Sequence, residues 1–212
     1  MRTTTHTKPN SWLLVPVTGI LLFIGLYIVA ACYYPGGSQA DAHSTGFSWI
    51  NNYWCNLLNE NAINGQRNTA RPIALTAMVI LSFTLAIFWY LFPVQAGLQK
   101  ALRITIQVSG VLAALIGLFI FTSYHDTITN LASLCGLIAT TGTFIGLYKL
   151  KWTKLFGLGI LNLLLVAINN LLYYSNGLLS YLPLVQKITF LSFLVWICGI
   201  TIGLYRKKSH IH

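Results

Sequence analysis

Acidic residues are scarce in this sequence. The 212 residues include 3 aspartates and glutamates against 13 lysines and arginines, and charged residues make up 8% of the chain. This shortage excludes an ordinary soluble domain, whose surface is about 25–35% charged. Hydrophobic residues make up 56% of the chain, and the mean hydropathy is +0.69. The chain is therefore expected to be a polytopic membrane protein.

Cysteine is scarce too. The 4 cysteines are too few and too scattered for a metal-binding framework. Cys135 and Cys198 lie within apolar runs, where we expect them to behave as small apolar side chains. Cys32 and Cys55 fall on the same predicted side of the membrane, where an oxidising compartment would permit a disulfide. That disulfide stays an open alternative.

Six apolar runs are long enough to cross a bilayer as helices. They are expected at residues 12–34, 73–94, 103–124, 128–149, 155–177 and 184–205. The third and fourth runs are separated by His125, Asp126 and Thr127 alone, which predicts a tight helical hairpin. The predicted fold is all-α, a bundle of six transmembrane helices that forms a single domain over residues 1–212.

Basic residues are distributed unequally between the two sides of this bundle. Arg67, Arg71 and Lys187 lie on one side, and the remaining lysines and arginines lie on the other. The positive-inside rule then predicts cytoplasmic N- and C-termini in a bacterial inner membrane, with all three acids outside. The basic residues form no continuous face, so membrane lipids rather than nucleic acid are the expected partners.

One connection is long. It runs over residues 35–72, and loops of this length are usually functional or carry structure of their own. Apolar side chains recur within it at three- and four-residue spacing: Phe47, Ile50, Trp54, Leu57 and Leu58. This pattern predicts an amphipathic helix over residues 46–61 that lies in the outer membrane interface. Its polar side would cover the outer mouth of the bundle as a lid.

Ionisable and polar side chains gather at this mouth, which is where a functional site is sought first. His125 and Asp126 are the candidate catalytic residues, because a histidine beside a carboxylate can act as a general base. The candidate ligand-binding residues are Arg67, Arg71, Glu60, Asn130, Asn169, Asn170, Tyr173 and Lys187. Structural roles compete with these: Arg67 and Arg71 would pair with Glu60 or Asp41, and Asp126 would cap the fourth helix.

Three functions fit this layout. The preferred one is binding, sensing or passing on a lipid-like or amphiphilic small molecule at the outer leaflet. The first alternative is a membrane-embedded lipid hydrolase, in which His43 and His125 would bind a divalent metal such as zinc. No cofactor is predicted otherwise, and whether the protein is an enzyme stays open.

The second alternative is a structural subunit of a membrane complex. Gly142-x-x-x-Gly146 and Gly199-x-x-x-Gly203 permit close helix contacts, so these glycine-bearing helices would form homo- or hetero-oligomers.

Short motifs recur in a familiar order. They are Tyr34-Pro35-Gly36, Asn56-Leu57, Asn68 to Pro72, His125, Gln186-Lys187 and Trp196. This order resembles the six-helix prokaryotic membrane family catalogued as domain of unknown function 998, over nearly the whole chain. The family often has Asp-Leu-Gly where this chain has Asn56-Leu57-Leu58, so a candidate acid is missing here. The resemblance implies a six-helix topology and a bacterial setting, but no activity.

Overall fold

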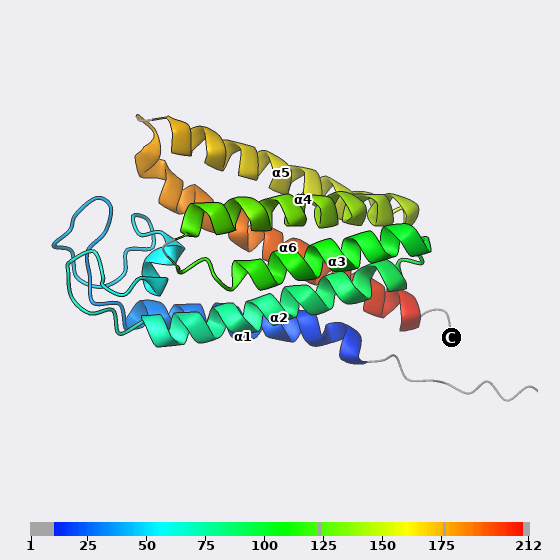
Figure 1. Cartoon of the computed structure of the whole chain (residues 1–212), viewed down its shortest axis with the longest axis horizontal. Coiled ribbons are helices and arrows are strands. Elements are labelled where there is room, and N and C mark those ends of the chain that lie inside the picture. The colour runs from blue at the N-terminus through cyan, green and yellow to red at the C-terminus, as the bar shows by residue number, and fades with distance from the viewer. Residues whose placement is uncertain (1–10, 123, 176, 210–212) are drawn as a thin grey trace, which may run out of the picture.

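The predicted six-helix bundle is confirmed. A computed structural model describes residues 11–209 except Ser123 and Asn176, and excludes the side chains of His125, Asp126, Lys208 and Ser209. Its α-helices are α1 (Val15–Cys32), α2 (Arg71–Gln95), α3 (Lys100–Gly117), α4 (His125–Lys149), α5 (Thr153–Tyr174) and α6 (Leu182–Ser209). Each lies in a segment long and apolar enough to cross a membrane, and they run side by side (Figure 1). The chain is thus a multi-pass membrane protein.

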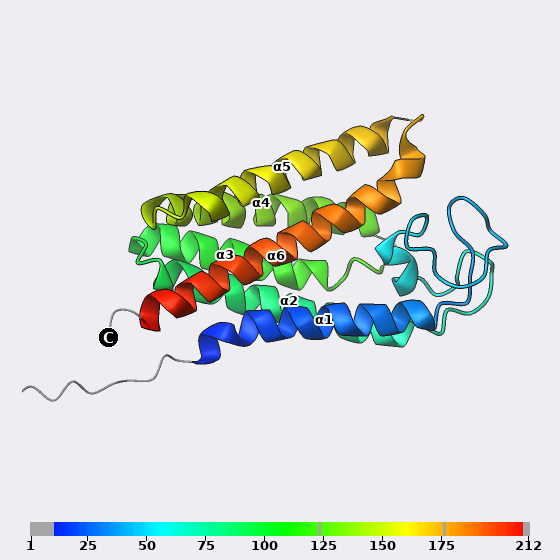
Figure 2. The same cartoon turned by 180° about the vertical axis from the view of Figure 1, so that it is seen from behind.

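Three short 3₁₀ helices accompany these spans. They are η1 (Ser11–Leu14), η2 (Trp54–Leu58) and η3 (Leu179–Tyr181). The first and last directly precede α1 and α6, whereas η2 belongs to the long connection between α1 and α2. We call residues 35–70 of this connection the cap. The cap closes one end of the bundle, and both chain ends leave from the other (Figure 1, Figure 2).

The amphipathic helix expected over residues 46–61 is not formed. The cap consists of turns around η2, which is 5 residues long. The cause is local competition from asparagine side chains. The Asn52 amide oxygen accepts from the Ser48 N–H (2.8 Å), and the Asn56 amide oxygen accepts from the Tyr53 N–H (2.7 Å). These bonds satisfy backbone donors in non-helical conformations, which asparagine favours.

The third span is shorter than its apolar run. α3 ends at Gly117, and residues 118–124 connect it to α4 in place of the expected three-residue hairpin. Hydrogen bonds to the third preceding residue tighten this connection, from the Phe119 N–H to Ile116 (3.0 Å) and from the Thr122 N–H to Phe119 (3.0 Å). Hydropathy cannot distinguish such apolar turns from helix, so the sequence placed the boundary too late.

The bundle is packed largely in chain order. α1 packs on α2, α2 on α3 and α3 on α4, whereas α5 lies mainly against α6. α5 diverges from α4 toward the cap end (Figure 1, Figure 2). The largest fully buried side chains fill the centre: Trp196, Phe23, Phe88, Phe92, Ile106 and Leu147. The α1–α4 layer is therefore the closely packed part of the fold.

The glycine pairs expected at an oligomer interface face neighbouring helices of the same chain. A Cβ at Gly142 would lie 2.3 Å from Ile106, and a Cβ at Gly146 would lie 2.6 Å from Phe92. The second pair, in α6, meets the start of α5 in the same way. These glycines permit close helix approach within the bundle, so their faces are already occupied.

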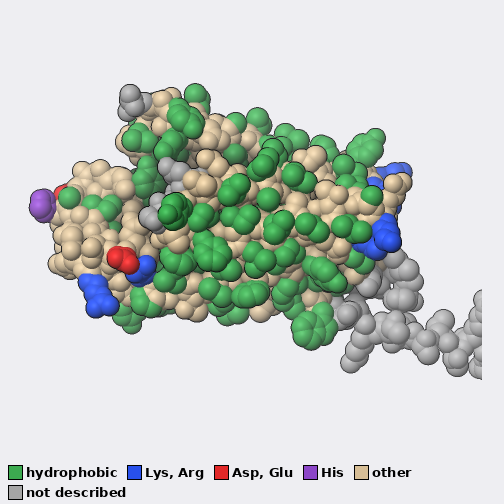
Figure 3. All heavy atoms as spheres, in the orientation of Figure 1, with side chains coloured by type: hydrophobic (Ala, Val, Ile, Leu, Met, Phe, Trp, Pro, Cys, Tyr) green, Lys and Arg blue, Asp and Glu red, His purple; other side chains and the backbone are tan. Residues whose placement is uncertain are grey.

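Charge divides the two ends of the molecule. Lysines and arginines gather where α3 begins and α4 ends, which we call the basic end, while the acids visible on this face lie at the cap end (Figure 3). The basic end holds Lys100, Arg103, Lys149, Lys151, Lys154, Arg206 and Lys207. This separation agrees with the charge asymmetry along the sequence.

Candidate functional site

A buried asparagine organises the cap. The Asn68 side-chain nitrogen lies within donating distance of three carbonyl oxygens, those of Asn56 (3.1 Å), Leu57 (3.2 Å) and Asn59 (2.9 Å). Its side-chain oxygen accepts from the Ala70 N–H (3.1 Å). One amide thus satisfies the carbonyls around the end of η2 and the first free donor before α2. Asn68 therefore holds η2 against the N-terminal end of α2.

A second asparagine fixes the other side of the cap. Asn52 is 0% exposed. Besides accepting from Ser48, it donates to the Gly37 carbonyl (2.8 Å) and lies 3.4 Å from the Asn56 amide oxygen. These bonds join segments of the cap that are distant in sequence, so the cap is preorganised although it contains little regular structure.

The cap inserts a tryptophan between spanning helices. The ring of Trp54 lies 6.0 Å from Phe23 and 5.3 Å from Tyr27 of α1, and 5.1 Å from Phe190 of α6, measured between ring centroids. Phe23 precedes the end of α1 at Cys32 by nine positions, which is about 13 Å along the helix axis. The cap therefore reaches into the bundle and does not merely lie on its surface (Figure 1).

Lys187 of α6 is buried beneath the cap. It is 5% exposed. Its ammonium donates to the Pro183 carbonyl (2.7 Å) and to the Asn52 carbonyl, and lies 6.0 Å from the centroid of the Phe47 ring. Carbonyl dipoles and a ring face stabilise this charge. The bond to Asn52 links the cap to α6.

Two orphaned polar atoms belong to Trp54 of the cap and to Gln186, which precedes Lys187 in α6. The Trp54 indole nitrogen is a buried donor and the Gln186 side-chain oxygen a buried acceptor, and neither has a partner among the described residues. Gln186 is one helical turn before Phe190, so it shares a face of α6 with the ring that contacts Trp54. An orphaned buried polar atom costs about 1–3 kcal/mol. Each such atom calls for a partner beyond the described residues, such as a water molecule or a ligand.

Cys55 completes the cluster and is not a reactive nucleophile. Burial raises the pKa of the Cys55 thiol, while its own backbone hydrogen bond and the positive charge of Lys187 lower it by a smaller amount. The net rise keeps Cys55 protonated near neutral pH. Reactive cysteines need a lowered pKa and exposure, so this environment favours a packing role.

Thiol labelling tests this environment. At a pH near the ordinary cysteine pKa of about 8.5, we expect N-ethylmaleimide to label Cys55 at least about tenfold more slowly than the exposed Cys32. Because the Cys55 pKa is raised, its rate-versus-pH curve should be displaced to higher pH. Mass spectrometry of the labelled peptides measures both rates. Equal rates at the two cysteines would show that the cap does not shield Cys55.

The arginines at the cap end have environments separate from that of Lys187. Arg71 binds Glu60 in an ion pair of 3.0 Å, in which the glutamate side chain is 77% exposed. Exposed pairs of this kind contribute about 0–1 kcal/mol. Arg67 is exposed on the cap. Arg71 and Glu60 thus form the pair expected under the structural alternative, while the Arg71 Nε is a buried donor without a partner among the described residues.

The α5 candidates have separate environments. Asn169 donates to the Leu165 carbonyl (2.8 Å) and to the Thr189 hydroxyl of α6 (2.5 Å), so it joins the two helices. Asn170 is exposed and donates to its own helix at Val166 (3.1 Å). Tyr173 is 58% exposed and packs edge-on against Tyr174. Asn130 of α4 is exposed as well. Of the ligand-binding candidates, Lys187 is the one that lies within the buried cluster.

The predicted metal and catalytic groups are incompletely described. His43 is exposed on the cap, and its N–H donates to the Asp41 carboxylate (2.8 Å). His125 and Asp126 begin α4, but their side chains lie outside the described residues. Among the side chains that the structure describes, no group of three histidines, cysteines or acids is placed to hold a metal. Cys32 and Cys55 are both free thiols, so the disulfide alternative does not apply.

Asn52, Trp54, Cys55 and Gln186 join Lys187 in the cluster, and the sequence analysis assigned none of them to the site. No family model, curated protein or solved structure matches the chain. The evidence on function is therefore the chemistry of this cluster.

Proposed function

We propose that the protein binds a small amphiphilic molecule beneath the cap. The observation that carries the proposal is that Trp54 of the cap and Gln186, the sequence neighbour of the buried Lys187 in α6, each hold an orphaned polar atom. A hydroxyl or phosphate oxygen can accept from the Trp54 indole N–H, and a hydroxyl can donate to the Gln186 oxygen. An ammonium has three donors, and Lys187 uses two on carbonyls. The third suits an oxygen-rich head.

The walls of the cluster suit the apolar part of such a molecule. Phe23, Tyr27 and Phe190 surround the Trp54 ring and offer aromatic surface continuous with the bundle interior. Binding sites for small molecules combine such apolar walls with a few converging polar groups. The ligand class is therefore an amphiphile with an oxygen-rich polar head, as in the lipid-like ligand expected from the sequence.

The cap acts as the lid of this site. Its base is fixed to α1, because the Thr69 hydroxyl donates to the Tyr33 carbonyl (2.6 Å) and the Ile63 N–H donates to the Tyr34 hydroxyl (3.0 Å). Its links to α6 are the Lys187 bond to Asn52 and the contact between the Trp54 and Phe190 rings. Opening at α6 would admit a ligand while the base stays in place. With the charge asymmetry read as positive-inside, the cap faces outward and the ligand enters from the outer leaflet of the inner membrane.

Replacing Gln186 with methionine tests the site. The Gln186 oxygen has no partner among the described residues, so its removal is expected to leave thermal stability unchanged or raise it by about 1 kcal/mol. Loss of one hydrogen bond to the ligand should lower the retained amphiphile by about tenfold. Mass spectrometry of small molecules extracted from the detergent-purified protein measures retention, and a thermal melt measures stability.

Two further variants sharpen this test. Trp54→Phe removes the orphaned donor and keeps an aromatic ring, and is expected to reduce retention similarly. Gln66→Met alters an exposed cap glutamine and is expected to change neither quantity. Equal retention by the wild type, Gln186→Met and Trp54→Phe would contradict the proposed function, as would the absence of any retained amphiphile in the wild type.

A further inference from the structure

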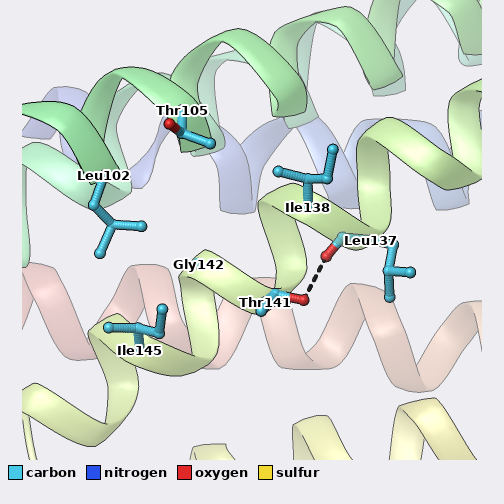
Figure 4. Close-up of a pocket in the computed structure, with 7 residues that line it drawn as sticks. All are labelled: Leu102, Thr105, Leu137, Ile138, Thr141, Gly142 and Ile145. Atoms are coloured by element: carbon cyan, nitrogen blue, oxygen red, sulfur yellow. Dashed lines mark hydrogen bonds between the residues drawn. The ribbon is translucent and has the colours of Figure 1, made fainter.

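A groove lies between α3 and α4, near the basic end and away from the cap. It has a volume of about 340 Å³. Its walls are formed by Leu102 and Thr105 of α3 and by Leu137, Ile138, Thr141, Gly142 and Ile145 of α4 (Figure 4). The groove lies within two membrane-spanning segments, where hydrocarbon is the surrounding solvent.

The lining of the groove suits a hydrocarbon chain. Its two hydroxyls are already used within their own helices: Thr141 donates to the Leu137 carbonyl (2.8 Å) and Thr105 to the Ala101 carbonyl (3.1 Å) (Figure 4). The other lining residues are aliphatic or glycine. Leu137 and Ile145 are eight positions apart, so the groove extends about 12 Å along α4. It offers an apolar channel without a free hydrogen-bonding group.

Basic side chains border the open end of this channel. Lys100 and Arg103 flank Leu102 at the start of α3, and Lys149 follows Ile145 by one turn at the end of α4. Lys149 donates to the Gly97 carbonyl, which holds its ammonium at the connection that leads into α3 and leaves two of its three donors for other partners. Guanidinium and ammonium groups bind phosphate oxygens strongly at such a membrane border.

Acidic side chains do not compete at this border. The chain has three acids. Asp41 and Glu60 belong to the cap, and Asp126 is in the first turn of α4, at the end opposite Lys149. We propose that this groove is a binding site for an anionic phospholipid, with one acyl chain between α3 and α4 and the phosphate at Lys100, Arg103 and Lys149. The site is independent of the cluster beneath the cap and serves a different leaflet.

Filling the groove provides the test. Thr141 is exposed, so Thr141→Phe places a ring in the channel without entering the core. Thr18→Phe is the matched control, because Thr18 is also an exposed threonine whose hydroxyl donates to its own helix, at Leu14 (3.5 Å). The full-length proteins are equilibrated with equal amounts of phosphatidylglycerol and phosphatidylcholine in mild detergent, and native mass spectrometry counts the lipids retained.

We expect the wild type and Thr18→Phe to retain phosphatidylglycerol in several-fold preference, and Thr141→Phe to retain about tenfold less of it. Lys100→Gln combined with Arg103→Gln should bring the preference close to one. Unfolding temperatures equal to the wild type confirm that the variants are folded. Unchanged phosphatidylglycerol retention by Thr141→Phe would overturn the proposal.

Discussion

Replacing Lys187 with methionine is expected to release the cap from α6 and to destabilise the protein by about 2 kcal/mol. The substitution keeps most of the side-chain volume and removes the ammonium, so the Asn52 carbonyl loses this donor, while the Pro183 carbonyl keeps the backbone N–H of its own helix. Each buried acceptor without a partner costs about 1–3 kcal/mol. Part of this cost is offset because a charge no longer has to be kept away from water.

The most specific readout of Lys187→Met is local opening of the cap. A loss of about 2 kcal/mol at the cap multiplies the population of its open form by about 30. Because Cys55 becomes accessible when the cap opens, its labelling by N-ethylmaleimide should accelerate by a similar factor. Thermal unfolding in detergent provides the global measurement, and peptide mass spectrometry the local one.

Lys154→Met is the control for this substitution. Lys154 is exposed in the first turn of α5, at the basic end. The same change of side chain there is expected to leave both unfolding and Cys55 labelling as in the wild type. If Cys55 labels at the wild-type rate in Lys187→Met, the cap is held to the bundle without this lysine, and its role as the link to α6 is disproved.

Asn68→Asp is expected to lower the free energy of unfolding more than Lys187→Met does. The variant keeps the shape of the side chain but replaces the donating nitrogen with an oxygen, which then faces the carbonyls of Asn56, Leu57 and Asn59. An ionised carboxylate donates no hydrogen bond. Several orphaned carbonyls and their repulsion of the new charge should together lower the unfolding free energy by about 4 kcal/mol.

Asn68→Asp should also introduce a pH dependence with a defined sign. A protonated carboxyl can donate again, so the loss should become smaller as the pH falls toward the ordinary aspartate pKa of about 3.9. Unfolding midpoints and limited proteolysis of the cap, each measured across pH, test this. Asn59→Asp changes an exposed neighbour and should match the wild type. A stable, protease-resistant cap in Asn68→Asp would show that Asn68 does not organise it.

The six spans could be predicted because hydropathy alone decides them. A run of about 20 apolar residues crosses a bilayer whichever side chains fill it, so each helix was placed correctly despite errors at its ends. The end of α3 was misplaced because residues 118–121 are as apolar as a helix. Their turn geometry depends on local hydrogen bonds that hydropathy does not encode.

The cap could not be predicted from its apolar spacing. Phe47, Ile50 and Trp54 recur at helical intervals. The backbone nevertheless forms turns, because asparagine side chains bind its N–H groups in non-helical conformations. A signal was present in the density of these amides: Asn51, Asn52, Asn56, Asn59, Asn61, Asn64 and Asn68. Asparagine disfavours helix interiors and favours turns, so this density argues against a helix over residues 46–61.

The candidate site was predicted in part. Lys187 was selected as a polar residue near the mouth, and the structure buries it under the cap. Trp54 was placed at the membrane interface, although its ring reaches the level of Phe23. The orphaned Gln186 oxygen carries no sequence signal, because only the packed helices show which polar atoms lack a partner. Asn162 of α5 is a similar case, because its buried side-chain amide has no partner among the described residues.

The bond between Lys187 and Asn52 also sets an order of events during synthesis. Its two ends are 135 residues apart, and a ribosome adds about 5–20 residues per second. In every nascent chain the cap therefore lacks its bond to α6 for roughly 7–27 seconds, until Lys187 has been synthesised. During that interval Cys55 and Trp54 are accessible to chaperones, oxidants and membrane proteases. A chain that stops before α6 cannot form this bond at all, so completion of the cap depends on the synthesis of α6.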